Sequence, residues 1–196
     1  ITKELSGNQS ADVTGIVAVQ GAFAEHAAML DSIGAPWRLL RSADDWDGSI
    51  SRVILPGCAS TTQGRLLRST GLDAPILRHL REGGPVLGTC AGMILLAERL
   101  ENDDAVYFGV LHATVRRNAY GRQLGSFVTT GSFGDIEDVP LVFIRGPYVV
   151  DVGSDVTVET VLDGHPVGLR QGSILATAFH PELTTDTRIH RLFLSL

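Results

Sequence analysis

Cys90 is the residue of this chain with the clearest capacity for chemistry, because it lies between two glycines where a strand pattern changes to a helix pattern. Residues 88–92 read Gly-Thr-Cys-Ala-Gly, after an apolar run at 85–87 and before an apolar helix start at 93–96. A tight strand-to-helix turn strains its central residue and displays that side chain at the carboxyl edge of a sheet. Gly88 and Gly92 are expected because a Cβ there would collide with the crossing elements. The positive helix end favours a thiolate, which predicts a nucleophile elbow. The pentapeptide alone also permits a buried structural cysteine.

A cysteine nucleophile needs a base, and the base needs an orienting group. His180 ends the apolar run at 174–179 and is followed by Pro-Glu. A histidine at the end of a parallel strand shares the sheet edge with Cys90, and Glu182 can turn back to a ring nitrogen. We therefore predict a Cys90–His180–Glu182 triad. The other histidines are interpreted as solvated or packing residues: His26, His79 and His190 in helices, His112 near a strand and His165 on a turn.

Strand and helix patterns alternate through the first half of the chain and predict the elements that position this triad. Strands are expected at 15–20, 37–40 and 52–57, and helices at 22–33, 63–69, 75–82 and 91–100. The second half predicts strands at 109–117, 126–131, 141–145, 156–162, 166–170 and 174–179, then a closing helix at 185–196. Asp163-Gly164 is a hairpin signal. We expect a flexible tail at 1–12 and a single domain at 13–196. Its predicted fold class is α/β, with three layers and a mostly parallel central sheet.

Composition excludes several classes of protein. The chain has 196 residues, 44% of them hydrophobic and 19% charged, which argues against disorder. Its formal net charge of −6 argues against nucleic-acid binding. Two cysteines cannot form a disulfide framework, and no signal peptide or apolar run of membrane length is visible. We expect a cytoplasmic protein that binds neither nucleic acid nor membrane. No metal-ligand spacing is visible, so no metal is expected.

The order Cys…His…Glu resembles that of the class I, triad-type glutamine amidotransferases. An α/β-hydrolase places its acid between nucleophile and histidine, whereas here the acid follows His180 directly. The family's third element is a Pro-Gly-Gly-type loop that supplies an oxyanion-hole N–H, and Pro56-Gly57 stands at the matching place. The resemblance implies the class I glutamine amidotransferase-like version of the three-layer fold.

Further segments are similar to one branch of that superfamily, the glutaminase subunits of pyridoxal phosphate synthase. The resemblance runs from about residue 15 to residue 196. The matching segments are 19–22 with 25–26, 60–62, 116–123, 143–147 and 178–184. Each piece is weak alone, but five in the right order are specific.

The resemblance implies a hydrolase that converts L-glutamine to L-glutamate and ammonia. Cys90 would attack the side-chain amide, His180 would move the proton, and Glu182 would orient His180. Backbone N–H groups of Cys58 and Ala91 would form the oxyanion hole. Arginine suits the α-carboxylate of glutamine because its planar fork matches a carboxylate. The implied substrate-binding residues are Cys58, Ala59, Ser60, Arg117, Ile144 and Arg145. Arg116 and Arg122 are interpreted as surface salt-bridge residues.

The resemblance also implies a partner. In the family, ammonia passes to a barrel-shaped synthase subunit of a large hetero-oligomer, which builds pyridoxal phosphate from a pentose phosphate and a triose phosphate. The pyridine chemistry belongs to that subunit, so no cofactor is expected here. Segments 20–26 and 118–123 are candidate docking or relay surfaces, or ordinary loop structure.

Residues 57–60 depart from the family pattern, because they read Gly-Cys-Ala-Ser where Gly-Gly-Glu-Ser is usual. A cysteine in a glycine-type conformation costs about 1–3 kcal/mol of strain. Two interpretations follow: a working glutaminase with an altered loop, which we favour, or a partner-binding subunit with an impaired active site. Cys58 and Cys90 could form a disulfide, or be two thiols too far apart to bridge. A cysteine peptidase would explain the elbow and His180, but not the matches at Arg117 and 144–145.

Overall fold

The computed structural model describes residues 12–57, 59–101, 103–118 and 125–196. Its first half alternates strands and helices, as the sequence pattern predicts. In chain order the elements are β1 (Val13–Val17), α1 (Phe23–Ser32), β2 (Trp37–Leu40), the short 3-10 helix η1 (Ala43–Asp45), β3 (Ile50–Leu55), α2 (Ser60–Ser69), α3 (Asp73–Arg81), β4 (Val86–Thr89) and α4 (Ala91–Leu96).

The second half is rich in strands and ends in one short helix. Its elements are β5 (Ala97–Leu100), β6 (Leu111–Arg116), β7 (Ser126–Phe133), β8 (Ile136–Ile144), β9 (Tyr148–Val152), β10 (Thr157–Leu162), β11 (His165–Gln171), β12 (Ile174–Thr177), the 3-10 helix η2 (Pro181–Leu183) and α5 (Arg188–Leu194).

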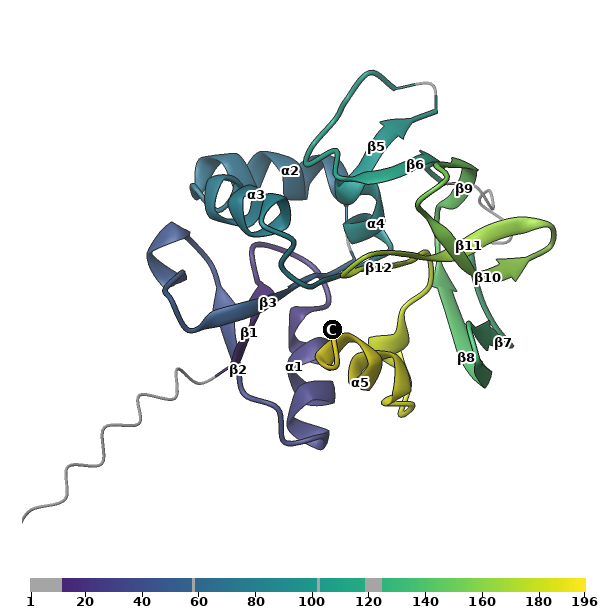
Figure 1. Cartoon of the computed structure of the whole chain (residues 1–196), viewed down its shortest axis with the longest axis horizontal. Coiled ribbons are helices and arrows are strands. Elements are labelled where there is room, and N and C mark those ends of the chain that lie inside the picture. The colour runs from purple at the N-terminus through teal and green to yellow at the C-terminus, as the bar shows by residue number, and fades with distance from the viewer. Residues whose placement is uncertain (1–11, 58, 102, 119–124) are drawn as a thin grey trace, which may run out of the picture.

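The centre of the molecule is a seven-stranded sheet with the order β10-β11-β12-β4-β3-β1-β2. The strands from β12 to β2 are parallel, and β11 and β10 add an antiparallel edge. Helices α1 and α5 lie on one side of this sheet, and α2, α3 and α4 on the other (Figure 1). The predicted three-layer α/β class with a mostly parallel sheet is confirmed.

Two neighbouring parallel strands, β4 and β12, set up the site. They pair in register from Ile174 opposite Val86 to Thr177 opposite Thr89. Residues that follow these strands therefore leave the sheet at the same carboxyl edge, where ligands bind in open α/β sheets. Cys90 follows β4 directly, and His180 follows β12 after two residues.

Local turn chemistry shapes the antiparallel edge. Strands β10 and β11 pair with Leu162 opposite His165, so only Asp163 and Gly164 separate them. Both residues have positive φ, 50° and 78°. This is the geometry that a two-residue type I′ hairpin turn requires, and glycine adopts it at little cost. The hairpin predicted from Asp163-Gly164 is confirmed.

The structure differs from the predicted elements in several places, among them two helices and one strand. The helix expected at 91–100 ends at Leu96, because the next four residues pair as β5 with β6. The closing helix, expected at 185–196, spans only Arg188–Leu194. Strand β9 was not predicted, and it is held by antiparallel pairing with β6. At the end of α4 and at β9, long-range strand pairing overrides the local pattern. The tail predicted at 1–12 lies, apart from Asp12, outside the described residues.

One cluster of buried apolar side chains extends through the described part of the chain, from β1 to α5. Its four largest fully buried members belong to the strand-rich half and the closing segments: Phe133, Phe143, Phe179 and Phe193. The rings of Phe143 and Phe179 pack edge to face with their centroids 5.9 Å apart, which ties β8 to the segment before His180. Among the described residues, no helix has the length and apolar character needed to cross a membrane.

Candidate active site

The turn after β4 has the strained geometry expected of a nucleophile elbow. Cys90 has φ 52° and ψ −104° and is 7% exposed. Its N–H donates to the Thr177 carbonyl at 2.7 Å, which fixes the turn to β12. A Cβ on Gly92 would lie 2.2 Å from the Leu55 carbonyl oxygen, and one on Gly88 would lie 2.9 Å from the backbone of Gly92. The crossing backbone therefore admits no side chain at either glycine, as the sequence predicts.

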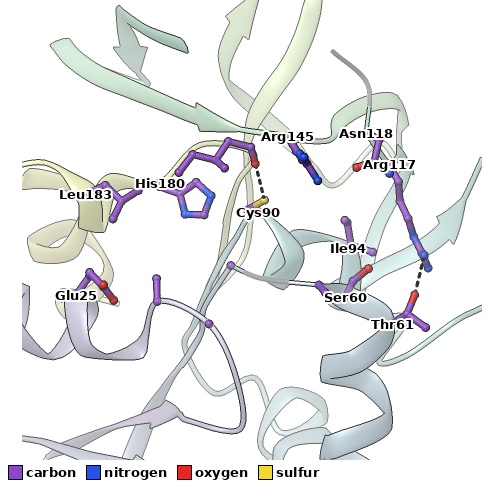
Figure 2. A pocket seen from close by; sticks show the side chains of 15 residues that line it. Glu25, Ser60, Thr61, Cys90, Ile94, Arg117, Asn118, Arg145, His180 and Leu183 are labelled. Atoms are coloured by element: carbon purple, nitrogen blue, oxygen red, sulfur yellow. Dashed lines mark hydrogen bonds between the residues drawn. The ribbon is translucent and has the colours of Figure 1, made fainter. Parts of the chain in front are cut away.

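His180 and Glu182 are brought together just beyond β12. The His180 N–H donates to the Val142 carbonyl at 2.8 Å, so β8 anchors the strand end. The next residues form η2, which turns the Glu182 side chain back. His180 Nδ1 is 2.5 Å from Glu182 Oε1, and both side chains are buried. Since a carboxylate can only accept, Nδ1 carries the proton and Nε2 is the nitrogen left for Cys90. Figure 2 shows the ring of His180 beside Cys90.

The surroundings of His180 favour its protonated form. Burial lowers the pKa of His180, but its hydrogen bonds to Cys90 and Glu182, and the charges of both partners, outweigh burial and raise the pKa from 6.5 to about 10. At neutral pH the imidazole therefore holds a proton. A protonated imidazole beside a nucleophile is the form that can give a proton to a leaving amine.

The loop after β3 closes the site from a third side. A Cβ on Gly57 would lie 2.4 Å from His180 Cε1 and 3.0 Å from Cys90 Cβ, so this backbone passes directly over the reactive pair. The buried Gln63 amide donates to the Pro56 carbonyl at 2.9 Å and holds the loop from α2. Sequence reasoning missed Gln63, whose position in a helix gives no sign of this contact.

The predicted loop residues are only partly described. Cys58, with its predicted oxyanion role and its possible disulfide to Cys90, lies outside the described residues. Ala59 precedes α2, Ser60 is its buried first residue, and both line the same cavity as Cys90. Ala91 is the first residue of α4, where a helical N–H has no partner within its own helix.

A cavity of about 660 Å³ opens above the triad. Cys90 lies between His180 on one side and the two arginines, Arg117 and Arg145, on the other (Figure 2). The volume and the mixture of apolar and charged lining suit a small amino acid. Among the described residues, no three histidine, cysteine, aspartate or glutamate side chains form a cluster able to hold a metal ion.

Arg117 lines the cavity and is already held by the protein. Its guanidinium donates to Thr61 Oγ1 at 3.1 Å and to the Tyr107 hydroxyl at 3.4 Å, and it is 3.1 Å from the Asp103 carboxylate. Its Nε is buried and has no hydrogen-bond partner among the described residues. These contacts fix the direction of the guanidinium and leave its Nε–H without a partner among the described residues.

The predicted 144–145 segment covers Cys90 from the side of β8. The Cys90 thiol lies 3.9 Å from the Ile144 carbonyl oxygen, within reach of a weak S–H donor bond. Arg145 has a positive φ of 48°, and its N–H donates to the Gly125 carbonyl. This turn aims the Ile144 carbonyl at the nucleophile and brings Arg145 to the cavity.

Two residues expected to be solvated or to serve only in packing lie directly behind the triad. His26 and His190 are both 0% exposed, and His26 Nδ1 is 2.9 Å from His190 Nε2. His26 Nε2 is 3.6 Å from the second Glu182 oxygen. The helical spacing could have indicated that His26 is buried, because it lies four residues before the buried Leu30 and so falls on the same face of α1. No spacing rule, however, links residues 26, 182 and 190.

The residues next to Arg117 in the sequence differ in whether they reach the cavity. Arg116 lies 3.7 Å from Glu101 at the surface, in agreement with the salt-bridge interpretation. Asn118 lines the cavity, whereas 119–124, with Arg122 and most of the predicted 118–123 surface, lie outside the described residues.

The other candidate docking or relay segment, 20–26, lies at the site. Its residues Gly21, Ala22 and Glu25 line the cavity.

Comparison with known proteins supports the geometric picture. The model of the SNO glutamine amidotransferase family matches residues 16–196. A Bifidobacterium longum protein (strain NCC 2705) named pyridoxal 5'-phosphate synthase subunit PdxT is 72% identical over 190 residues, covering 94% of this chain and 100% of the relative. A relative of the same name from Desulfitobacterium hafniense (strain DSM 10664 / DCB-2) is 49% identical over 180 residues, covering 92% and 90%.

A solved structure described as a crystal structure of glutamine amidotransferase matches with a TM-score of 0.87 at 38% identity. It covers 93% of this chain and 97% of that chain. The resemblance predicted from the sequence is confirmed. On these matches, the chain belongs to the SNO glutamine amidotransferase family.

Proposed function

We propose that this chain is the glutaminase subunit of a pyridoxal phosphate synthase, and that Cys90, His180 and Glu182 are its catalytic residues. The observation that carries the proposal is that Cys90 and His180 line one cavity and that the buried Glu182 holds the His180 ring from behind, in a chain 72% identical to a PdxT subunit. The reaction is hydrolysis of L-glutamine to L-glutamate and ammonia.

The proposed first half-reaction forms a thioester. The Cys90 sulfur, with its proton already on His180 Nε2, attacks the side-chain amide carbon of glutamine and forms a C–S bond. His180 then gives its proton to the amide nitrogen, the C–N bond breaks, and ammonia leaves. Glu182 holds the imidazole by Nδ1 and keeps Nε2 toward sulfur and substrate. Water then attacks the thioester, giving a proton to His180, and releases glutamate and the thiol.

The negative charge that develops on the amide oxygen must be stabilised by hydrogen-bond donors whose positions are fixed before the reaction. We assign the Ala91 N–H, at the start of α4, and the N–H of Cys58, the residue that follows Gly57 in the sequence. The approach of Gly57 to both His180 and Cys90 supports this loop as the second donor. Removal of one oxyanion-hole donor typically lowers kcat about 10²- to 10³-fold.

Glutamine is oriented by groups across the cavity from His180. We assign Arg117 and Arg145 to the α-carboxylate, because both line the cavity and arginine matches carboxylate geometry. The unused Nε–H of Arg117 supports this assignment. Ala59, Ser60 and Ile144 complete the predicted binding set, together with Cys58.

The proposed partner is the barrel-shaped synthase subunit, which receives the ammonia within a large hetero-oligomer. The printed names of the relatives as synthase subunits support this assignment. We place the complex in the cytoplasm, where reducing conditions keep the Cys90 thiol free. We propose no nucleic-acid or membrane partner.

The test is release of glutamate from glutamine, measured with and without an added synthase subunit. We expect turnover that rises with the synthase and that falls at least about 10³-fold in Cys90→Ala, which keeps the fold but lacks the nucleophile. Absence of turnover in both conditions, with stable binding to the synthase, would instead support a partner-binding subunit impaired by the Cys58-Ala59 loop.

A further inference from the structure

A pair of buried histidines lies behind Glu182, on the side away from Cys90. His26 belongs to α1 and His190 to α5, two helices on the same side of the sheet (Figure 1). Their rings are 5.2 Å apart between centroids, and the nitrogens that face each other are 2.9 Å apart. Both side chains are 0% exposed. The predicted chemistry of the triad makes no use of either residue.

His26 lies close to one member of the triad, Glu182, and to Thr89, which is next to another member, Cys90. His26 Nε2 is 3.6 Å from Glu182 Oε2, slightly longer than a hydrogen bond, and 3.3 Å from the hydroxyl of Thr89, which precedes Cys90. Glu182 Oε2 is buried and has no closer hydrogen-bond partner among the described residues. A buried carboxylate oxygen without a donor is costly, so His26 is the group placed to satisfy it.

Both histidines are neutral at neutral pH. Burial lowers the pKa of His190 to about 4. Burial, followed by electrostatic interaction with His190 and His180, holds the pKa of His26 well below 6.5. Each ring therefore carries one proton, and the position of that proton determines what His26 presents to Glu182.

Only one arrangement of the two protons leaves every buried N–H with an acceptor. If His190 Nε2 donates to His26 Nδ1, then His26 Nε2 carries a proton, and the acceptors near it are the Thr89 hydroxyl at 3.3 Å and Glu182 Oε2 at 3.6 Å. The reverse arrangement turns a lone pair of His26 toward the carboxylate. It also leaves a proton on His190 Nδ1, which has no partner among the described residues. A buried donor without an acceptor is rarer than an unused acceptor.

We propose that His26 and His190 form a positioning pair, in which His190 fixes the Nε2–H form of His26 and His26 holds the second oxygen of Glu182. Glu182 is then held at both oxygens, by His180 and by His26. This prevents rotation of the carboxylate away from Nδ1 of His180. The inference rests on the proposed glutaminase activity for its kinetic consequence, but not for the proton positions.

The kinetic test uses the chain bound to its synthase subunit. We expect His26→Phe to lower kcat about 10- to 100-fold, as loss of a hydrogen bond to a charged group predicts, with KM for glutamine changed less than about 2-fold. His26→Gln, which can return an N–H near Nε2, restores most of kcat. His79→Phe is the control, because His79 is a half-buried helical histidine that contacts the Pro85 carbonyl and the Trp46 ring and does not line the cavity; its kcat stays at the wild-type value.

Two further measurements separate positioning from loss of folded protein. Rates are expressed per active site, counted by labelling Cys90 with a chloroketone analogue of glutamine. A double-mutant cycle with Glu182→Gln is then expected to be non-additive, so that His26→Phe has little further effect once the carboxylate is gone. Fully multiplicative effects, or equal losses in His26→Phe and His26→Gln, would overturn the proposal.

The proton positions are tested in the unmodified protein by NMR of ring ¹⁵N-labelled histidine at pH 7. We expect a neutral His26 with its proton on Nε2. A proton on Nδ1, or on both nitrogens, would overturn the proposal whether or not any variant folds. If wild-type protein releases no glutamate, the proposed function fails, while this measurement still decides the hydrogen-bond arrangement.

Discussion

Two neighbours determine the charge on His180: Glu182, which orients its ring, and Cys90, the proposed nucleophile. Glu182 orients the ring from Nδ1, and Cys90 lies on the side of Nε2. Together they overcome the effect of burial, which by itself would make His180 neutral. The resting site therefore combines a nucleophile with a base that already holds its proton, an arrangement suited to ammonia release.

The first prediction concerns the pH dependence of that proton. Because the folded-state pKa is raised from 6.5 to about 10, the proton stabilises the folded protein fully below pH 6.5, and the stabilisation is lost as the pH rises toward 10. NMR titration of His180 should show a protonated ring through pH 9. In Glu182→Gln the titration should move to lower pH. A wild-type midpoint near 6.5 would contradict the assignment.

Among the elements, the β4–α4 turn depends most strongly on residue type. Its glycines are required by close approach of backbone rather than by an unusual φ, since only Cys90 has a positive φ in the turn. The strain is concentrated on the residue that needs exposure to the cavity. Helix α4 then packs against β4 and β3 and holds the turn.

The second prediction tests this turn. In Gly92→Ala the new Cβ would meet the Leu55 carbonyl at 2.2 Å, so β3 or α4 must shift. We expect a loss of about 1–3 kcal/mol of unfolding free energy, as for overpacked cores, and a loss of glutaminase activity in the protein that remains folded. Urea unfolding and glutamate release provide the two readouts.

Gly48→Ala is the matched control for that substitution. A Cβ at this position meets no atom within 4 Å. Its unfolding free energy should change by less than about 1 kcal/mol, and its activity should be that of the wild type. Equal behaviour of Gly48→Ala and Gly92→Ala would show that contact with Leu55 is not what excludes a side chain from the elbow.

In the whole molecule, the α/β half and the strand-rich half share one apolar core. The buried cluster includes Ile16 in β1, Phe143 in β8 and Phe193 in α5. The His26–His190 contact and the β4–β12 pairing join parts of the chain that are distant in sequence. The active site lies where these parts meet, so it depends on both halves being folded.

The third prediction follows from this shared core. Residues 13–196 should unfold as one cooperative unit. Trp37 and Trp46 report on the first half by fluorescence, whereas far-UV circular dichroism reports on all strands and helices. The two urea transitions should coincide. Separated transitions would show that the predicted single domain consists of two independently stable parts.

Much of the site could be predicted from sequence because its geometry depends on residues that are close together in the chain. The elbow at Cys90 requires glycines at fixed offsets, and the hairpin requires two residues that tolerate positive φ. His180 and Glu182 are two residues apart, so their contact needs only a turn. The failures occurred where pairing with distant strands decides the outcome, as at the end of α4 and in β9.

The sequence by itself therefore determined the class of fold, the family resemblance, the elbow and the identity of the proposed triad. These depend on residue type, short spacing and the rule that parallel strands share a carboxyl edge. Tertiary structure alone decided that His26 and His190 lie behind Glu182, because 164 residues separate the two histidines and no periodic pattern spans that distance. It also decided that Arg117 is held by Thr61, Tyr107 and Asp103, since hydrogen-bond partners depend on how distant surfaces pack.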